Sequence, residues 1–178
     1  MINLIPLADS GETHFAKELF EAAFPEAERP PFEELKHRGE RFHFMVATND
    51  DDPIGILTYW DFDEFVYVEH FAIDEDLRDQ GLGKAVFLNF LSATTEQVVL
   101  EVEPPHDETS EHRIEFYISM GLNQNPQEYW QPSYRNPQKL ELPMVVLSKL
   151  ELSDEDFSDI RTTLYTEVYH RNSKKIEK

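Results

Sequence analysis

A glycine-containing turn between a strand-like and a helix-like segment constrains this chain more than any other feature. Residues 65–73, FVYVEHFAI, are rich in aromatic and β-branched side chains and predict a strand. Apolar side chains recur at helical spacing over residues 81–93 and predict an amphipathic helix. Gly81 and Gly83 lie where that helix would begin. Backbone N–H groups at the positive end of a helix dipole would be exposed there, an arrangement that binds phosphate.

Two common nucleotide-binding patterns do not fit this turn. Ala85 stands where the Walker pattern requires Ser or Thr, and Val86 replaces the third glycine of the dinucleotide fingerprint. What remains is Arg78-x-x-Gly81-x-Gly83. It resembles the acetyl-CoA pyrophosphate loop of the GNAT superfamily of N-acetyltransferases, whose signature is [Q/R]-x-x-G-x-[G/A]. The alternative interpretation is an ordinary loop with a pair of cap glycines.

A second stretch, about thirty residues further on, resembles another GNAT pattern. In that family the helix after the fifth strand often carries N-x-x-A-x-x-x-Y-x-x-x-G-[FL]. Tyr117 and the pair Gly121-Leu122 fix the register here, which places Ser110 at the Asn position and Arg113 at the Ala position. Ser110 keeps the ability to donate and accept hydrogen bonds, with a shorter reach than Asn.

The resemblance implies a mixed α/β (α+β) chain with the GNAT fold, in which helices flank a central mixed, mostly antiparallel sheet. It implies one domain over residues 1–150, with a C-terminal helix and basic tail over residues 151–178. Periodicity and turn residues predict the same order of elements. The expected strands are 1–6, 42–48, 54–60, 65–73, 97–103, 128–130 and 142–148, and the expected helices are 13–24, 31–38, 81–93, 108–120 and one from Ser153.

The implied activity is transfer of the acetyl group of acetyl-CoA to a primary amine of a small molecule or peptide. The amine would attack directly, with no covalent enzyme intermediate. Tyr117 matches the family's general acid: a Tyr hydroxyl with a pKa near ~10 stays protonated and can give its proton to the departing thiolate. Core packing is the other interpretation of a lone helical Tyr. The alternative function is a catalytically weak GNAT-fold module that binds CoA or regulates.

The general base is less sharply indicated than the acid. Glu69 lies at the strand position where some GNAT enzymes place a catalytic carboxylate. An unperturbed Glu, with a pKa of ~4.3, accepts a proton from an ammonium poorly, so burial or a water relay would be needed. Glu101, Glu103 and His70 are rivals. A structural ion pair or a solvated strand residue is the competing interpretation of Glu69.

The resemblance also implies where acetyl-CoA is held. Backbone N–H groups at the end of the 65–73 strand would stabilise the acetyl oxygen, and those of the glycine turn would bind the pyrophosphate. The expected cofactor contacts are Phe71, Ala72, Ile73, Arg78, Asp79, Gln80, Gly81, Leu82, Gly83, Lys84, Ser110 and Phe116. No histidine shows metal-ligand spacing, so no metal is expected.

The composition indicates which compartment and which classes of partner suit the chain. The chain has no cysteine, which suits a reducing cytoplasm, and its first residues read as a strand rather than a signal peptide. The longest apolar runs fall short of the ~18 residues of a membrane span. A net charge of −20 disfavours nucleic acid and favours a cationic acceptor. The aromatic residues of segment 124–138 are expected to shape the acceptor end, and packing in the core or at a homodimer contact is equally open.

Overall fold

The computed structural model describes residues 1–171. The predicted basic tail therefore lies, apart from Arg171, outside the described residues. Internal contacts divide the chain into two compact units. The first unit contains Met1–Glu26 and Pro31–Leu100, and the second contains Ala27–Pro30 and the chain from Glu101 onward.

The first unit is built on a sheet with the strand order β1-β2-β3-β4-β5. Its neighbours pair antiparallel except β4 and β5, which are parallel. Each of these strands was predicted, because alternating and β-branched side chains mark them clearly. Their bounds are β1 Ile2–Pro6, β2 Phe42–Asn49, β3 Asp52–Asp61, β4 Phe65–Ile73 and β5 Gln97–Val102, the last of which continues into the second unit.

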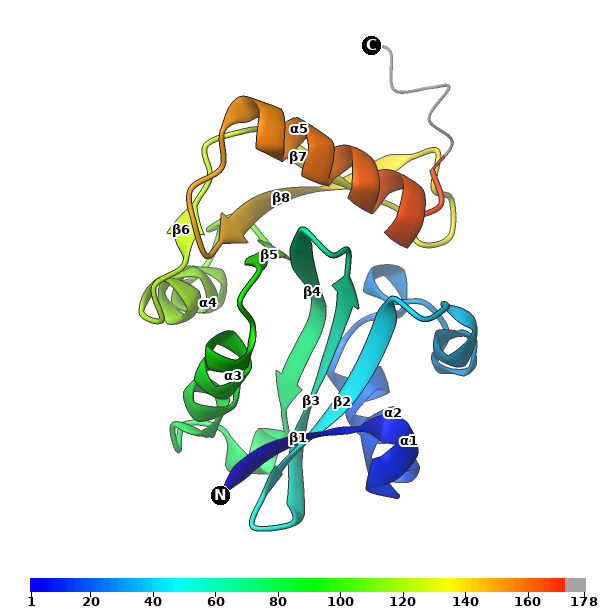
Figure 1. The fold of residues 1–178 in the computed structure, drawn as a ribbon, viewed down its shortest axis with the longest axis vertical. Coiled ribbons are helices and arrows are strands. Elements are labelled where there is room, and N and C mark those ends of the chain that lie inside the picture. The colour runs from blue at the N-terminus through cyan, green and yellow to red at the C-terminus, as the bar shows by residue number, and fades with distance from the viewer. Residues whose placement is uncertain (172–178) are drawn as a thin grey trace. The chain divides into compact units, whose positions relative to one another are not determined.

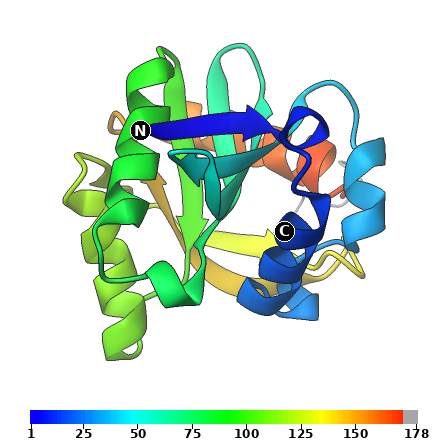
Figure 2. The same ribbon diagram turned by 90° about the horizontal axis from the view of Figure 1, so that it is seen from below.

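Helices cover both faces of this sheet, as Figures 1 and 2 show for α2 and α3. On one face Phe20 of α2 and Leu35 pack against Phe44 and Ile56. On the other face Val86 of α3 packs against Ala47 and Ile73. The bounds are α1 Leu7–Ser10, α2 Thr13–Ala23, α3 Leu82–Ala93 and the 3-10 turns η1 Glu26–Glu28, η2 Phe32–His37 and η3 Glu75–Leu77.

The second unit combines a helix, three strands and a C-terminal helix. β8 pairs antiparallel with both β6 and β7. Tyr129 of β7 packs against Phe157 of α5 and against Tyr165, which follows α5. The bounds are α4 Glu108–Ile118, β6 Asn123–Gln124, β7 Tyr129–Pro132, β8 Leu140–Ser148, α5 Asp154–Thr163 and a π-helical turn η4 Leu164–Val168. Figure 1 shows α5 running along the β7–β8 hairpin.

Three expectations about local structure were wrong. The helix predicted over residues 31–38 is a 3-10 segment, since it is too short to form more than two turns after Pro31. The helix predicted over 108–120 ends at Ile118, and Gly121 then takes a φ of 93°. The spacing of Ile114, Tyr117 and Ile118 predicts one apolar stripe on this helix, but Ile118 is 42% exposed.

Candidate functional site

The glycine turn connects β4 to α3 through a short, locally bonded loop. The Asp74 side chain accepts a hydrogen bond from the Asp76 backbone N–H and so caps η3. The Arg78 Nε then donates to the Ile73 carbonyl oxygen at 3.2 Å. Asp79 and Gly81 follow with φ of 61° and 76°, in the left-handed region. The chain therefore turns sharply out of the strand and enters the helix at Gly81.

Gly81 occupies the N-cap position of α3. As a glycine it has no side chain with which to cap the helix. The Ala85 N–H donates to the Gly81 carbonyl oxygen at 3.1 Å and closes the first turn. Helix geometry gives the amides ahead of Ala85 no intrahelical acceptor. A Cβ at Gly81 would meet no atom within 4 Å, so the space in front of this turn is open.

The end of β4 contains a change of register. Thr58 of β3 pairs with His70, but Tyr59 pairs with Val68. Glu69 is thus the extra residue of a β-bulge, a feature that re-aims side chains. The parallel pairing with β5 joins Val68 to Leu100 as its last pair among the described residues. The predicted oxyanion segment, residues 71–73, lies beyond that pairing.

Glu69 contacts Arg38 and Trp60 on the face of the sheet that carries α2. Its side chain is 0% exposed, and the Arg38 guanidinium contacts its Oε2 at 2.5 Å. The Trp60 Nε1 donates to the same oxygen at 2.7 Å. The guanidinium of Arg38 also lies over the Phe42 and Trp60 rings, at 4.9 and 4.7 Å from their centroids. Neither Arg38 nor Trp60 was singled out from the sequence, and a contact spanning 31 residues leaves no local signal there.

The rival carboxylates and His70 are also engaged. The His70 Nδ1 lies 3.1 Å from the Thr58 hydroxyl, and its ring meets Phe20 and Phe24 edge-on. In the second unit the Glu101 carboxylate accepts hydrogen bonds from side chains of the same unit. The Arg113 Nη1 lies 3.4 Å from the Glu103 Oε2. The donors to Glu101 are the hydroxyls of Tyr129 and Tyr169 and the amide of Gln131, at 2.5, 3.0 and 2.7 Å.

Tyr117 is buried on α4 in the second unit. Its side chain is 8% exposed, and its ring contacts Phe116 edge-on at 5.1 Å between centroids. Burial raises the pKa of Tyr117 well above its usual range, against a smaller opposing effect of Arg113. The hydroxyl is therefore protonated throughout the neutral and mildly alkaline range, as a proton donor must be.

Ser110 closes the N-terminus of α4. Its backbone N–H donates to the Asp107 Oδ1 at 2.8 Å, and its hydroxyl accepts the backbone N–H groups of His106 and Asp107, each at 3.0 Å. The hydroxyl can also donate to the Asp107 carboxylate, 2.8 Å away. These contacts form a capping box. The Asn position of the family pattern thus holds a residue that serves the helix itself.

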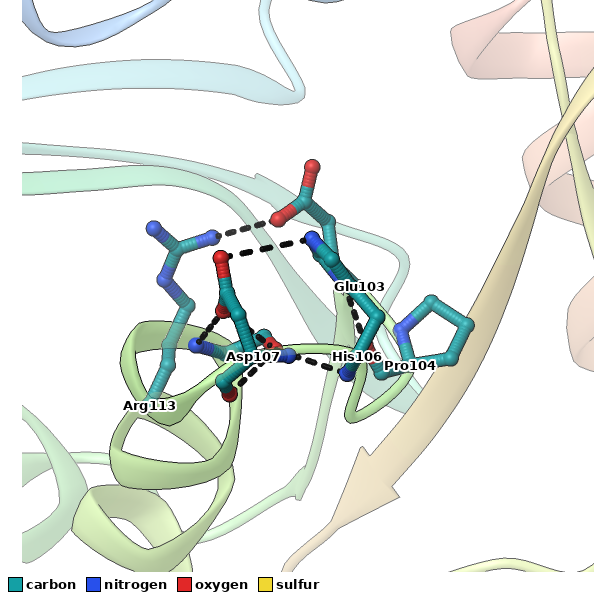
Figure 3. Close-up of polar contacts among 6 residues, drawn as sticks. Glu103, Pro104, His106, Asp107 and Arg113 are labelled. Atoms are coloured by element: carbon teal, nitrogen blue, oxygen red, sulfur yellow. Dashed lines mark hydrogen bonds and ion pairs between the residues drawn. The ribbon is translucent and has the colours of Figure 1, made fainter.

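Charged groups surround this cap, as Figure 3 shows. The hydrogen bonds from Ser110 lower the pKa of Asp107. The pKa of His106 is raised, first by its hydrogen bond to the Pro104 carbonyl oxygen and then by Asp107. Among the described residues no group of three or more His, Asp or Glu side chains could hold a metal ion. No helix in the same range is long and apolar enough to cross a membrane.

A comparison with protein families decides the class of the chain. Residues 13–121 match the model described as the acetyltransferase (GNAT) family. This chain belongs to the GNAT acetyltransferase family. The fold prediction is thereby confirmed, and the chain is assigned to the acyltransferase enzymes.

Relatives of the chain agree with this assignment. A candidate acetyltransferase of the GNAT family from Bacteroides thetaiotaomicron superposes with a TM-score of 0.87 at 37% identity, covering 97% of this chain and 99% of that one. The Bacillus subtilis (strain 168) protein YjbC, also named as a candidate acetyltransferase, is 33% identical over 85 residues. That match spans 47% of this chain and 41% of YjbC.

More distant structures share the fold. An aminoglycoside 6′-N-acetyltransferase complexed with coenzyme A has a TM-score of 0.59 at 12% identity, over 86% of this chain and 99% of that one. The Escherichia coli ribosomal-protein-S18-alanine N-acetyltransferase has a TM-score of 0.57 at 16% identity, over 88% and 97% of the two chains. At such identities the likeness shows the fold alone.

Proposed function

We propose that the chain transfers the acetyl group of acetyl-CoA to a primary amine. The observation that carries this proposal is the start of α3, where Gly81 enters the helix with a positive φ and no side chain caps it. The turn follows β4 and the short η3, and its sequence Arg78-x-x-Gly81-x-Gly83 resembles the pyrophosphate loop of the family to which the chain belongs. The amides of residues 78–84 are the proposed pyrophosphate ligands, since a helix N-terminus favours anions.

The chemistry requires a neutral amine, a stabilised oxyanion and a proton for the leaving sulfur. Acetyl-CoA supplies the thioester, whose C–S bond breaks as the C–N bond forms. The backbone of Phe71–Ile73 is proposed to stabilise the carbonyl oxygen, because it extends past the β4–β5 pairing. Tyr117 is proposed to protonate the thiolate, and its burial keeps that proton in place until sulfur charge develops.

Glu69 remains the proposed carboxylate on the acceptor side, where the amine must lose a proton. Its contacts with Arg38 and Trp60 fix the carboxylate in one orientation. Phe116 and Ser110 are proposed to contact the cofactor arm. The contribution of Ser110 is expected to be small, because its hydroxyl already serves the α4 cap.

The acceptor is proposed to be a cationic small molecule or a peptide amine in the cytoplasm. The net charge of −20 attracts cations and repels nucleic acid. The distant relatives include an enzyme named for aminoglycosides and one named for a ribosomal protein, so both acceptor classes occur on this fold. Neither name decides the acceptor here.

The test combines calorimetry with an activity assay. Titration with acetyl-CoA should show one site per chain, and free thiol should appear when polyamines, aminoglycosides or basic peptides are added. No binding of acetyl-CoA would refute the proposal. Binding without thiol release on any amine would favour the alternative, a GNAT-fold module that binds CoA without transfer. Two observations favour that alternative: Ser110 serves the cap, and Glu69 contacts Arg38.

A further inference from the structure

An arginine outside both GNAT motifs holds the bulge of β4. Arg38 follows the 3-10 segment η2, whose Leu35 is buried in the core of the α2 face. Its side chain is 8% exposed although it carries a charge. Arginine is rarely buried unless it is paired, and here the pair is Glu69. The chain therefore keeps a buried ion pair between a loop and the bulge of its central strand.

The groups around Arg38 fix the orientation of its guanidinium, in addition to the charge pairing with Glu69. The guanidinium lies over the rings of Phe42 and Trp60, two residues that are cross-strand partners in β2 and β3. The Trp60 Nε1 reaches the same Glu69 oxygen that Arg38 contacts. A planar guanidinium suits this stacked position, where a flexible ammonium would not. Residues of β2, β3, β4 and the end of η2 thus meet around one ion pair, and Arg38 and Trp60 contact its carboxylate directly.

The bulge at Glu69 lies next to the segment proposed to contact the acetyl oxygen, so the contacts of Arg38 and Trp60 with Glu69 bear on the reaction. Glu69 and His70 both contact groups on the α2 face, Trp60 and Thr58 respectively. In a regular strand neighbouring side chains point to opposite faces, so the bulge is what allows both contacts. Phe71–Ile73 follow immediately. A change at Glu69 is therefore expected to shift the backbone of the segment proposed to contact the acetyl oxygen.

We propose that Arg38 is a positioning residue for acetyl transfer, which holds the Glu69 bulge and thereby sets the backbone of Phe71–Ile73. This inference rests on the proposed function for its catalytic consequence. It adds a residue that touches no reacting atom and acts through Glu69. Removing one partner of a buried pair leaves the other charge uncompensated, so loss of either residue should disturb the same strand.

The test compares Arg38→Gln with Arg41→Gln. Arg41 lies three residues further on and pairs with Asp63 at the surface, with side chains 51% and 81% exposed. Arg38→Gln should lower kcat about 10- to 100-fold, the scale of a misplacement near 1 Å, while acetyl-CoA affinity changes less than about threefold. Arg41→Gln should leave both within about twofold. A merely structural loss would not separate kcat from affinity in this way.

A double-mutant cycle tests whether Arg38 acts through Glu69. The variant carrying Arg38→Gln and Glu69→Gln should be about as active as the slower single variant, because both changes break one contact. Arg38→Lys should recover part of the lost kcat. Fully additive effects, or wild-type kcat in Arg38→Gln, would overturn the proposal. If Arg38→Gln does not fold, Trp60→Phe removes the second donor to Glu69 and should show a smaller fall in kcat with unchanged affinity.

Hydrogen exchange separates this proposal from the proposed function. If the wild-type chain binds no acetyl-CoA or releases no thiol, acetyl transfer is refuted, but the claim about β4 can still be measured. Arg38→Gln should speed amide exchange in residues 69–73, and Arg41→Gln should not. Unchanged exchange at residues 69–73 in Arg38→Gln would overturn the positioning role by itself.

Discussion

The helix α3 and the helix α4 begin in opposite ways. α3 starts at Gly81, with no side-chain cap and open space where a Cβ would stand. α4 starts at Asp107, whose capping box with Ser110 satisfies the first amides from within the chain. Every helix N-terminus has such amides to satisfy. The first turn of α4 is thus capped by side chains of its own helix, whereas α3 begins at a glycine, which is why we propose the α3 N-terminus as the anion site.

The largest loss of acetyl-CoA affinity is expected when a negative charge is placed at the N-terminus of α3. Gly81→Asp should weaken acetyl-CoA binding about 1,000-fold, since like charges ~4 Å apart repel by roughly 4 kcal/mol at an effective dielectric of 20. Gly81→Asn is the matched control, because Asn tolerates a positive φ about as well as Asp and carries no charge. It should bind within about tenfold of the wild type. Equal losses in both variants, by calorimetry, would mean that shape rather than charge matters at this turn.

A smaller loss, confined to turnover, is expected on α4. Tyr117→Phe should lower kcat about 100-fold, the usual scale of general acid catalysis, and leave acetyl-CoA affinity unchanged. Because burial raises the pKa of Tyr117, the wild-type rate should show no fall from its ionisation between pH 6 and pH 9. Tyr165→Phe is the control, since it removes a hydroxyl that donates to the Trp130 carbonyl oxygen. Unchanged turnover of Tyr117→Phe over that pH range would remove the general-acid role.

Breaking the α4 cap should change stability rather than binding. Asp107→Ala removes the side chain that accepts the Ser110 N–H, and it should lower Tm by about 2–4 °C. Acetyl-CoA affinity of the folded protein should stay within about twofold. A tenfold loss of acetyl-CoA affinity without a change in Tm would mean that the ligand binds at the N-terminus of α4 rather than at that of α3.

The same cap should make stability depend on pH. The pKa of Asp107 is lowered in the folded chain, so its contribution is complete above the pKa of an unfolded Asp, ~3.9, and is lost as pH falls through the folded pKa. The difference in unfolding free energy between the wild type and Asp107→Ala, measured by denaturant unfolding, should therefore be full at pH 7 and shrink as the pH falls below ~3.9 towards pH 2. An undiminished difference at pH 2 would show that the cap acts without its charge.

The smallest effect is expected for Ser110→Ala. The variant should lose a part of the cap and a little stability, with acetyl-CoA affinity reduced less than about threefold. Thermal melts and calorimetry on the same sample measure both quantities. An affinity loss above tenfold would give Ser110 the full role of the family's Asn.

Much of the fold could be predicted because periodicity is a local signal. The strands β1 to β5 and the helices α2 and α3 follow from alternation, apolar spacing and turn residues near their ends. The two-residue strand β6 and the four-residue helix α1 are too short to carry a period. The π-helical turn η4 was also missed, and there Tyr165 and Tyr169 are buried against the second unit's own strands.

The site residues likewise fall into those with a local sequence signal and those without one. The positions of the glycine turn before α3 and of Tyr117 on α4 could be predicted, because short motifs mark them in the chain, and their roles stay predictions. The role of Ser110 in the cap needed the positions of His106 and Asp107, and a search for Asn at its position overlooked the capping box. Arg38 could not be predicted, since its contacts with Glu69 and Trp60 are made across the sheet. Long-range pairs of this kind become visible only once the strands are registered.

We propose above all that the N-terminus of α3, which begins at Gly81, binds the pyrophosphate of acetyl-CoA. A crystal structure of the chain with coenzyme A tests it most directly. Pyrophosphate oxygens are expected within hydrogen-bond distance of backbone N–H groups between Arg78 and Lys84, with the Asp107–Ser110 cap of α4 intact. Pyrophosphate bound at the α4 N-terminus, or anywhere else with residues 78–84 untouched, would contradict it.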